Sequence, residues 1–587
     1  MIQRTNLNLY TGMRRVETEI AEVEQPFEVD YAGACTNEEI VQAARYYLLQ
    51  WFGRDANIAS PNLTAPKAPK LNVTLRTKGL VRGSMSGSGE TLQEQIYDAV
   101  QRACQDARFT GRLVEADIED VTIEVWLQTL CEYVPPQSRS ASDTLMLGVD
   151  GVEVSCDGFY AYYKPSVALT SGFKTAEALY NALCQKAGLP ADAWRDPACE
   201  VNKTKWIHIL ERRPGQALPL NALRFTNRQV ITPEFIEAWI QSGAEYLRQN
   251  QYPNGSFCYK YYPFTNTSRA GKTNPVRASG CAYAMSLGAS YLAGKGDGRY
   301  IESAKRACSD ILKRLVVSGQ SHAYVADSDP PGEGGKLGTS ALFLLALLCP
   351  VCDEPAYSVP MAALLEGIKA AQDSSGLFRC AFGNCVESES SVDFFPGQAL
   401  LALIRRTEAG DLTCAEHYRA AFEVYRDHFR RRPTTAFVGW HVDVWSRASR
   451  LGGNLDYAYF VFEQLDWLLQ YQVTSSSDHL FAGGFVRSDG PPNSSSVVFT
   501  EAVARGAALA YELGDARWKT YREAFLSGMQ FCNRLKLTDC QAPFFPFPRR
   551  AVGGVVRSIS NFQVRSDVVQ HAITLGLAAA TAPVLLE

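Results

Sequence analysis

A recurring turn phrase is the feature that most constrains the fold of this chain. Residues Gln251–Phe257 read Gln-Tyr-Pro-Asn-Gly-Ser-Phe, and residues Gln372–Phe378 read Gln-Asp-Ser-Ser-Gly-Leu-Phe. Looser versions follow Gln472 and Gln541, and each contains a Gly-Gly pair before an apolar residue. A helix–turn phrase that recurs along a chain is typical of repeat architectures, in which each unit buries its apolar face on its neighbours. The carboxy-terminal part is therefore expected to consist of repeated helical units.

Helical periodicity supports this expectation. From Thr232 onward, apolar residues recur at helical spacing in about twelve segments, the last of them near residues 567–580. Twelve helices joined by short connections predict six helical hairpins. Hairpins arranged in a ring would bury one face of each inner helix and leave a funnel at the loop end.

Three phrases in this region resemble a known family. They are Asn274–Gly280, Lys336–Leu342 and Phe395–Leu400. They are similar to those of the (α/α)6 toroid shared by six-hairpin glycosidases, polysaccharide lyases, uronyl epimerases and, in related form, terpene cyclases, and in particular to a bacterial branch near the glucuronyl epimerases. The resemblance implies a toroid of about 350 residues. That branch often has Glu where this chain has Gln398, so no catalytic carboxylate is expected there.

The amino-terminal part has a different pattern. Thr36–Glu39 is a capping signal for a helix, residues 71–76 and 121–127 alternate as strands do, and an amphipathic helix is expected from about Leu92 to Asp106. The glycines at Gly83 and Gly87 predict a tight turn between the first strand and this helix. The mixed order of strands and helices indicates an α+β domain, separate from the helical one.

This part resembles the AMMECR1 domain family. The resemblance is carried by Val81–Ser84, Asp106–Phe109 and Lys186–Trp194, which match the family's LRGC-like, D-x-RF and KAGL-x-x-x-xW sequences. Ser84 stands where the family usually has Cys, so this chain is expected either to have lost any chemical role of that thiol or to have replaced the thiol with a hydroxyl. The expected fold is therefore multidomain, with an α+β AMMECR1-like domain over residues 1–228 and an all-α (α/α)6 toroid over residues 229–587.

Composition excludes several classes of function. The net charge is −4 and the one basic cluster, Arg430–Arg432, is short, so no nucleic acid is expected as a partner. No run approaches the roughly 20 apolar residues of a membrane helix, so no membrane association is expected. Residues Met1–Asn6 lack the apolar core of a signal peptide, and the 16 cysteines have no framework spacing. These observations favour a cytoplasmic protein with reduced thiols.

No cofactor or metal site is predicted. There is no GxGxxG or Walker phrase, and the single CxxC at Cys349–Cys352 has no second pair at zinc-finger spacing. We interpret Cys349 and Cys352 as buried thiols beside a helix end, with a metal or redox site as the alternative.

Ionisable residues inside late apolar helices are the catalytic candidates, because charge in a packing helix is costly unless it is paired or faces a wet cavity. Asp466, Glu501, Asp567 and His571 are predicted to converge, and Tyr261 is a candidate proton donor. Asp567 and His571 are four residues apart and therefore share a helix face. Two carboxylates can act as general acid and base, or a carboxylate can orient a histidine base. The alternative for each pair is a structural ion pair.

Basic and amide side chains near these positions are candidates for binding substrate. Arg277 lies three residues after Asn274 at the start of an apolar helix, where a guanidinium and free backbone N–H groups suit an anion. Lys336 and Arg565 are further candidates. A helix cap and a structural ion pair are the alternative for Asn274 and Arg277.

Together these patterns predict an enzyme of the glycoside hydrolase, lyase or epimerase kind, with an acid/base site in the toroid funnel. The expected substrate is small and carbohydrate-like or anionic, and the reaction is hydrolysis, elimination or epimerisation. One alternative is a tailoring enzyme of a peptide or natural-product pathway, and another is a non-catalytic module whose funnel holds a partner. The amino-terminal domain is a possible docking site for another protein. Carboxylates about 5 to 10 Å apart would favour glycoside hydrolysis, whereas a tyrosine–histidine cluster around an arginine would favour elimination or epimerisation.

Overall fold

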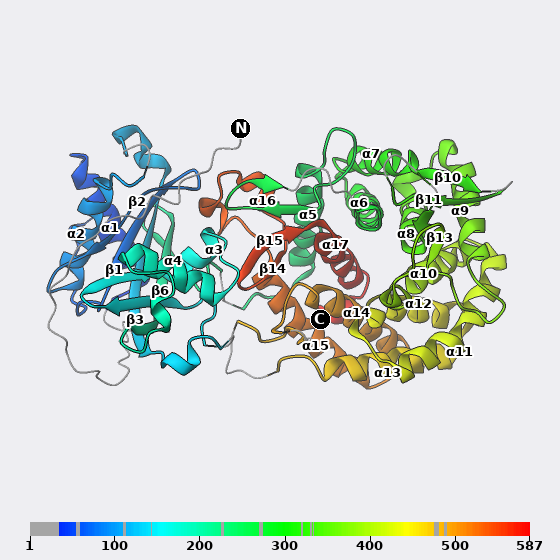
Figure 1. Cartoon of the computed structure of the whole chain (residues 1–587). Helices are drawn as coiled ribbons and strands as arrows, with labels where there is room; N and C mark the ends of the chain where they lie inside the picture. The colour runs from blue at the N-terminus through cyan, green and yellow to red at the C-terminus, as the bar shows by residue number, and fades with distance from the viewer. Residues whose placement is uncertain are drawn as a thin grey trace.

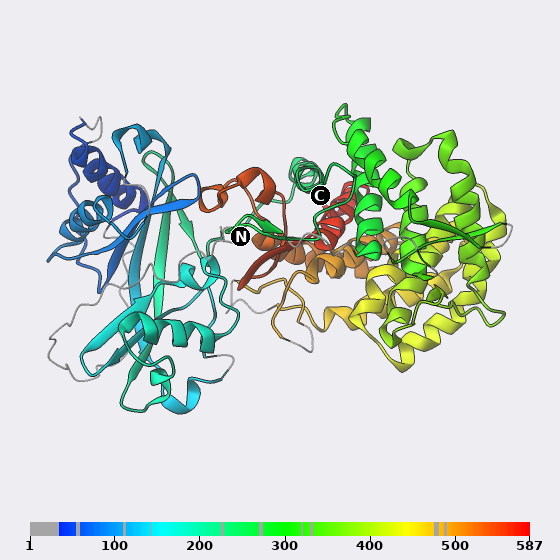
Figure 2. The same cartoon turned by 45° about the horizontal axis from the view of Figure 1, so that its top comes forward.

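The computed structural model describes residues 35–54, 59–109, 113–141, 144–224, 228–268, 274–318, 321–328, 332, 334–474, 480–486 and 490–586. Residues Met1–Asn6, on which the expectation of no signal peptide depends, lie outside the described residues. A sheet domain and a ring of helices lie side by side (Figures 1 and 2). Within the described residues, no helix combines the length and hydropathy needed to cross a membrane.

The first domain is an antiparallel sheet in the order β2-β1-β3-β6-β4-β5, with β7 paired to β6. Its strands are β1 (Leu71–Thr77), β2 (Leu80–Gly87), β3 (Val121–Tyr133), β4 (Gly151–Cys156), β5 (Phe159–Tyr163), β6 (Glu200–Arg213) and β7 (Gln216–Leu220). Its helices are α1 (Asn37–Trp51), α2 (Leu92–Cys104), α3 (Pro165–Thr170) and α4 (Ala176–Ala187). The predicted α+β class is confirmed, as is the capping box of Thr36 and Glu39 at the start of α1.

Alternation along β1 gives this sheet two different faces. Leu71, Val73 and Leu75 belong to the core shared with α1 and α2. The intervening side chains of Asn72, Thr74 and Arg76 are buried on the opposite face. The sheet therefore carries an apolar face under two helices and a polar face that is also covered.

The turn predicted at Gly83 and Gly87 is wrong, because both glycines lie within strand β2. Their role is close packing against α2: a Cβ atom at Gly83 would lie 1.9 Å from the carbonyl oxygen of Ala103, and one at Gly87 would lie 1.8 Å from that of Gln95. The turn itself falls at Lys78 and Gly79, both of which have positive φ. The glycine spacing thus reflects contact between strand and helix, which a local sequence pattern does not distinguish from a turn.

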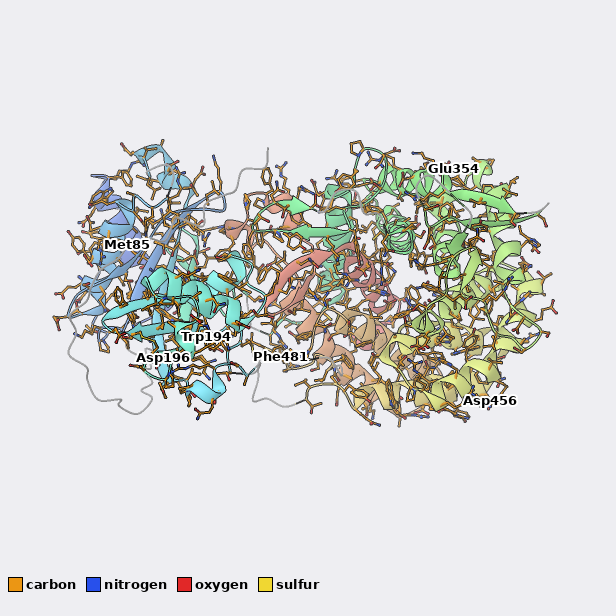
Figure 3. All side chains as sticks on the ribbon, in the orientation of Figure 1. Met85, Trp194, Asp196, Glu354, Asp456 and Phe481 are labelled. Atoms are coloured by element: carbon orange, nitrogen blue, oxygen red, sulfur yellow. A yellow bond between two sulfur atoms is a disulfide. The ribbon has the colours of Figure 1, made fainter. Side chains whose placement is uncertain are left out.

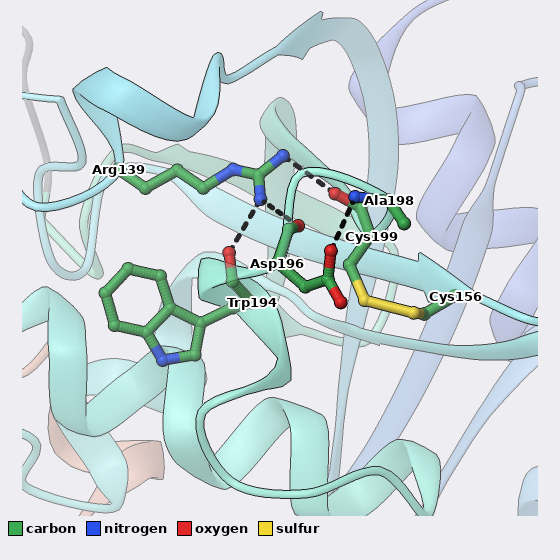
Figure 4. Close-up of a disulfide and its surroundings, with 6 residues drawn as sticks. All are labelled: Arg139, Cys156, Trp194, Asp196, Ala198 and Cys199. Carbon is green, nitrogen blue, oxygen red and sulfur yellow. Dashed lines mark hydrogen bonds between the residues drawn. A yellow bond between two sulfur atoms is a disulfide. The ribbon is translucent and has the colours of Figure 1, made fainter.

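One pair of cysteines departs from the predicted reduced state. Cys156 at the end of β4 forms a disulfide with Cys199 just before β6, with a Cα–Cα distance of 4.6 Å (Figure 4). Beside it, buried Arg139 donates to the backbone oxygens of Trp194, Asp196 and Cys199. The sequence separation of 43 residues hides this pairing, because only the adjacency of β4 and β6 brings the two thiols together.

The second domain is a closed ring of helical hairpins, as predicted. The inner helices are α6 (Pro275–Gly294), α8 (Leu337–Leu347), α10 (Phe395–Glu408), α12 (Thr435–Gly452), α14 (Ser496–Glu512) and α17 (Ser566–Ala580). The outer helices are α5 (Pro233–Gln249), α7 (Ile301–Leu312), α9 (Ser358–Ala370), α11 (Ala415–Arg431), α13 (Leu455–Leu469) and α15 (Arg517–Leu535). Each inner helix packs on the next, and α17 packs on α6 to close the ring (Figure 1).

The repeated turn phrase joins four of the hairpins to the next outer helix. Gln251 bridges its own turn and the Ser303 oxygen of α7, and Gln372 does the same with the His417 oxygen of α11. Gln472 makes the equivalent bond to the Ala524 oxygen of α15. In the fourth turn the equivalent residue is Lys536 and not Gln541, and its ammonium donates to the Trp239 oxygen of α5. This last bond helps to connect the end of the ring to its beginning.

The domains meet through an aromatic loop of the ring. Phe544 packs 6.0 Å from the His208 ring of the sheet, and the Arg76 guanidinium lies over the Phe544 ring at 5.3 Å. A Cβ atom at Gly79 would lie 2.2 Å from the Phe545 backbone, so the loop touches the β1–β2 turn directly. The Phe544 ring packs on the polar face of the sheet, whereas the Phe545 ring packs against Phe264 at 5.4 Å.

A second contact lies at the other side of the boundary. Arg224, fully buried, donates to the backbone oxygens of Ile559 and Ser558 and lies over the Phe562 ring. Trp194 of the sheet domain and Phe481 of the ring lie on either side of the boundary and line one groove (Figure 3). The apolar core is continuous from Trp126 and Leu210 of the sheet into the ring. We place the domain boundary between β7 and α5.

Candidate functional site in the toroid

The start of α17 and the start of α6 bring together an arginine–carboxylate cluster. Asp567 on α17 is buried and lies 3.2 Å from Nε of Arg277 on α6. Arg565, just before α17, donates to Oδ1 of Asp567 at 3.0 Å. Burial alone would raise the pKa of Asp567, but Arg277 and Arg565 lower it below its usual range. The carboxylate is therefore ionised and held between two guanidinium groups.

One turn further along α17, His571 is oriented by a second carboxylate. Its Nδ1 lies 3.0 Å from Oε2 of Glu501 on α14, and the Thr574 hydroxyl donates to the same oxygen at 2.7 Å. Arg505 donates to the other carboxylate oxygen at 2.8 Å. Burial alone would raise the pKa of Glu501, but Arg505 and His571 lower it. Glu501 is thus an ionised acceptor that fixes the histidine ring.

The free side of His571 is the part that can react. Among the described residues its Nε2 has no hydrogen-bond partner, and the side chain keeps 10% exposure. The Trp440 ring of α12 packs edge-on against the imidazole at 5.3 Å. A histidine with Nδ1 bonded to a carboxylate and Nε2 available is arranged as a general base.

Tyr259, not the predicted Tyr261, is the tyrosine at this cluster. Tyr259 lines a hollow with Asn274, Arg277 and Ser566, and the Arg565 guanidinium lies over its ring at 5.5 Å. Burial and the nearby charge of Asp567 raise the pKa of Tyr259, so its phenol stays protonated. Tyr261 lies on β8 (Lys260–Tyr262), is fully buried and bonds to Asn266, which removes it from the site. The sequence did not distinguish the two, because they are neighbours in one aromatic run.

Asp466 does not converge with the other candidates. It lies on outer helix α13, where it accepts a 2.6 Å hydrogen bond from Tyr521 and its side chain is 53% exposed. Glu501, Asp567 and His571 lie on inner helices and come together. The prediction of a four-residue cluster was therefore right for these three and wrong for Asp466. The reason is that periodicity shows an apolar face but not whether a helix belongs to the inner or the outer layer.

The remaining substrate-binding candidates have defined positions. Asn274 caps α6 by accepting from the backbone N–H of Arg277, which is the structural role considered for it. Lys336 precedes α8 and pairs with Asp327 at 2.6 Å; within the described residues no contact joins it to Arg277 or Asp567. Arg277 keeps 38% exposure, so its guanidinium can bind Asp567 and still meet a ligand. A substrate-binding role for these residues stays a prediction.

A buried charge network continues from the site into the ring, and the sequence analysis missed it. Arg505 of α14 bridges Glu501 and Asp443 of α12, and Arg447 connects Asp443 to Glu408 of α10. Each step within a helix spans four residues, so the i, i+4 spacing of Glu501 with Arg505 and of Asp443 with Arg447 was the available signal. The network fixes three inner helices relative to one another.

The thiols of the CxxC phrase are buried, as interpreted. Cys349 and Cys352 follow the end of α8, and Cys352 lies 3.6 Å from the sulfur of Cys308 on α7. Among the described residues, no group of three or more histidine, cysteine and carboxylate side chains has the arrangement of a metal site.

Comparison with known proteins gives different matches for the two domains. The AMMECR1 family model matches residues 42–205. A protein of Methanothermobacter thermautotrophicus is 34% identical over 134 residues, which is 22% of this chain and 68% of that protein. A protein of Methanococcoides burtonii is 30% identical over 126 residues, covering 21% of this chain and 62% of the relative. One from Thermococcus gammatolerans is 34% identical over 113 residues, and the chain spans 53% of its length.

Solved structures match each domain at low identity and with TM-scores below 0.5. An uncharacterized protein from Pyrococcus horikoshii has 23% identity, covers 31% of this chain and 97% of its own, and gives a TM-score of 0.28. A D-mannose isomerase has 11% identity and a TM-score of 0.46, with 59% of this chain and 97% of its own covered. A GH76 α-mannanase of Bacteroides thetaiotaomicron has 10% identity and a TM-score of 0.42, with 60% and 97% covered. The toroid described above is established by its own helix order and contacts.

Proposed function

The chain belongs to the AMMECR1 family through its amino-terminal domain, and we propose that its toroid carries a separate catalytic site for proton transfer on a small anionic, carbohydrate-like substrate. The reaction class is epimerisation, isomerisation or elimination. The observation that carries this proposal is the His571 imidazole, whose Nδ1 is bonded to ionised Glu501 while its Nε2 faces away from that bond.

The charges of the site favour proton transfer over glycoside hydrolysis. Hydrolysis needs one carboxylic acid that keeps its proton near neutral pH, and such an acid requires a raised pKa. Arginines instead lower the pKa of both Glu501 and Asp567. Neither carboxyl group suits the role of general acid, whereas the protonated phenol of Tyr259 does.

The substrate class follows from the groups at the starts of α6 and α17. Arg277 presents a partly exposed guanidinium, the side chain best suited to a carboxylate. A carboxylate held there would acidify the neighbouring C–H bond, and His571 could then remove that proton while Tyr259 donates one to the opposite face or to a leaving oxygen. A hydroxylated acid of the uronic type combines these features.

Proton exchange tests this proposal directly. The full chain is incubated with a panel of uronic acids and matching neutral sugars in deuterium oxide, and deuterium at the carbon next to the carboxylate is followed by NMR. We expect exchange with at least one acid and a loss of about a hundredfold or more in His571→Gln. His322→Gln is the matched control, because His322 is exposed at the start of β11 (His322–Val325) and is not among the residues that line the hollow.

The role of Arg277 gives a second readout. Arg277→Gln is expected to raise KM for the acidic substrate by about tenfold or more, because it removes a charge-assisted contact. Release of a reducing sugar without deuterium exchange would overturn the proposal in favour of hydrolysis. An unchanged KM in a folded Arg277→Gln variant would remove Arg277 from substrate binding.

A further inference from the structure

The amino-terminal domain contains a basic cavity that the proposed toroid chemistry does not use. Its volume is about 190 Å³, and it lies between the polar face of β1, strand β2 and the segments that follow β5 and α2. Five of its lining side chains are basic, namely Arg76, Arg102, Arg108, Lys164 and Lys186. None of the described lining residues is acidic. The volume is below the roughly 300 Å³ of the smallest drug-sized pockets, so the cavity suits a small ligand.

Lys164 lines this cavity among neutral partners. Its ammonium donates to Oδ1 of Asn72 at 2.6 Å, to the hydroxyl of Thr74 and to the hydroxyl of Ser84 at 3.3 Å. Trp126 adds a ring face at 5.4 Å. The charge of Lys164 therefore has no anion as a direct hydrogen-bond partner among the described residues. Charges that are partly withdrawn from water are commonly paired.

Cations surround Lys164 on several elements. Burial lowers its pKa to about 7; Glu124 on β3 opposes this shift, whereas Arg76, Lys186 and Arg108 add to it. Burial and Arg108 likewise lower the pKa of Lys186 to about 8. Like charges held this close repel one another, and an anion between them would relieve that repulsion.

Carboxylates behind the cavity wall offset only part of this charge. Asp106 binds Arg108 through two hydrogen bonds of 2.8 Å, and Glu124 pairs with Arg76. Asp98 lies 3.5 Å from Arg102. These three acids face the three arginines, and no acid among the described residues bonds directly to the ammonium of Lys164.

We propose that this cavity binds a small ligand through a compact anionic group, with Lys164 and Lys186 as its cationic contacts and Ser84 as a neutral donor. The chemical class is a tetrahedral dianion such as a phosphate, or a carboxylate. Ser84 stands where the resembling family has Cys, and a hydroxyl is a far better hydrogen-bond donor than a thiol. Lys186, from the KAGL sequence, and Ser84, from the LRGC-like sequence, thereby line the same site.

Calorimetric titration of the full chain with sulfate, inorganic phosphate and succinate tests this site. Binding of the two tetrahedral anions alone identifies a phosphate-type group, and binding of succinate alone identifies a carboxylate. Lys164→Met and Lys186→Met are each expected to weaken binding by about tenfold or more, because each removes a charge-assisted contact. Lys67→Met is the matched control, since Lys67 is 52% exposed on the same domain and pairs with Glu90 outside the cavity.

Sulfate also provides a pH test, because its own charge is constant over the range. Both lysines are protonated below about pH 7, and they lose their protons as the pH rises through about 7 and about 8. Sulfate affinity is therefore expected to fall between about pH 6 and about pH 9 in the unsubstituted chain and to fall less steeply in Lys164→Met. Absence of anion binding at millimolar concentration, or equal affinity in both lysine variants and the control, would overturn the proposal.

Discussion

At the scale of single residues, the toroid site depends on carboxylates that stay ionised although they are buried. Asp567 is held by Arg277 and Arg565, and Glu501 by Arg505 and His571. Burying an isolated carboxylate would cost several kcal/mol, so the pairing is what allows these acids inside the ring. The same pairing decides their chemistry, because an acid with a lowered pKa orients and binds but does not donate a proton near pH 7.

Asp567→Asn is expected to destabilise the fold by about 1–3 kcal/mol near pH 7, because two arginines would then face each other without their anion. The pKa of Asp567 is lower in the folded chain, so its contribution is complete above the unfolded carboxyl pKa. The contribution disappears as the pH falls through the folded value. Urea unfolding across the acid range should therefore show a smaller pH dependence in Asp567→Asn. Asp466→Asn, on the exposed side of α13, is the control, and equal effects of the two variants would contradict the argument.

At the scale of elements, the repeated turn packs one hairpin against the outer helix of the next. Gly255, Gly376, Gly483 and Gly553 all have positive φ. A Cβ atom on them would lie 1.9–2.3 Å from a backbone oxygen of the next outer helix, with Gly553 meeting Ser242 of α5. Glycine is required at each position for two reasons, the left-handed backbone and the close approach. The recurring phrase in the sequence thus encodes contact between neighbouring hairpins and not only a change of direction.

Gly376→Ala separates the two reasons when it is compared with Gly410→Ala. Both glycines have φ near +95°, at +93° and +97°, so both variants incur the backbone strain of about 1 kcal/mol. A Cβ atom at Gly376 would lie 2.3 Å from the Ala420 oxygen, whereas one at Gly410 meets nothing within 4 Å. We expect a loss of about 2–4 kcal/mol for Gly376→Ala and about 1 kcal/mol for Gly410→Ala, measured by urea unfolding. Similar losses in both variants would show that the close contact with α11 does not contribute to the free energy of unfolding.

At the scale of the whole molecule, the two domains share one apolar core. The Phe544 loop covers the polar face of the sheet and contacts Arg76, which also lines the basic cavity. On the other side Arg224 anchors the sheet domain to the strand pair of β14 (Val556–Ser558) and β15 (Asn561–Arg565). A buried arginine with backbone acceptors from another domain holds a fixed orientation, because separating the domains would leave those carbonyls without their donor.

Phe544→Ala is expected to weaken the attachment of the two domains by about 2–4 kcal/mol, because it removes a buried ring from the interface. Differential scanning calorimetry should then show the sheet domain unfolding at a lower temperature than the ring. Phe547→Ala is the control, since Phe547 is 53% exposed. If the thermal unfolding transition is unchanged in Phe544→Ala, this ring does not attach the two domains to each other. Arg224 would then be the next residue to replace.

Local sequence determined the elements of this protein, and only the tertiary structure decided the neighbours of each side chain. Apolar periodicity, the cap at Thr36 and the repeated turns predicted the helices of the ring and the α+β order of the first domain, because these signals act within a few residues. Ring closure by Lys536, the choice of Tyr259 over Tyr261, the outer position of Asp466 and the pairing of Cys156 with Cys199 depend on segments up to about 300 residues apart. Helical periodicity fixes which face of a helix is apolar, but the partner of that face is set by the packing of all the helices together.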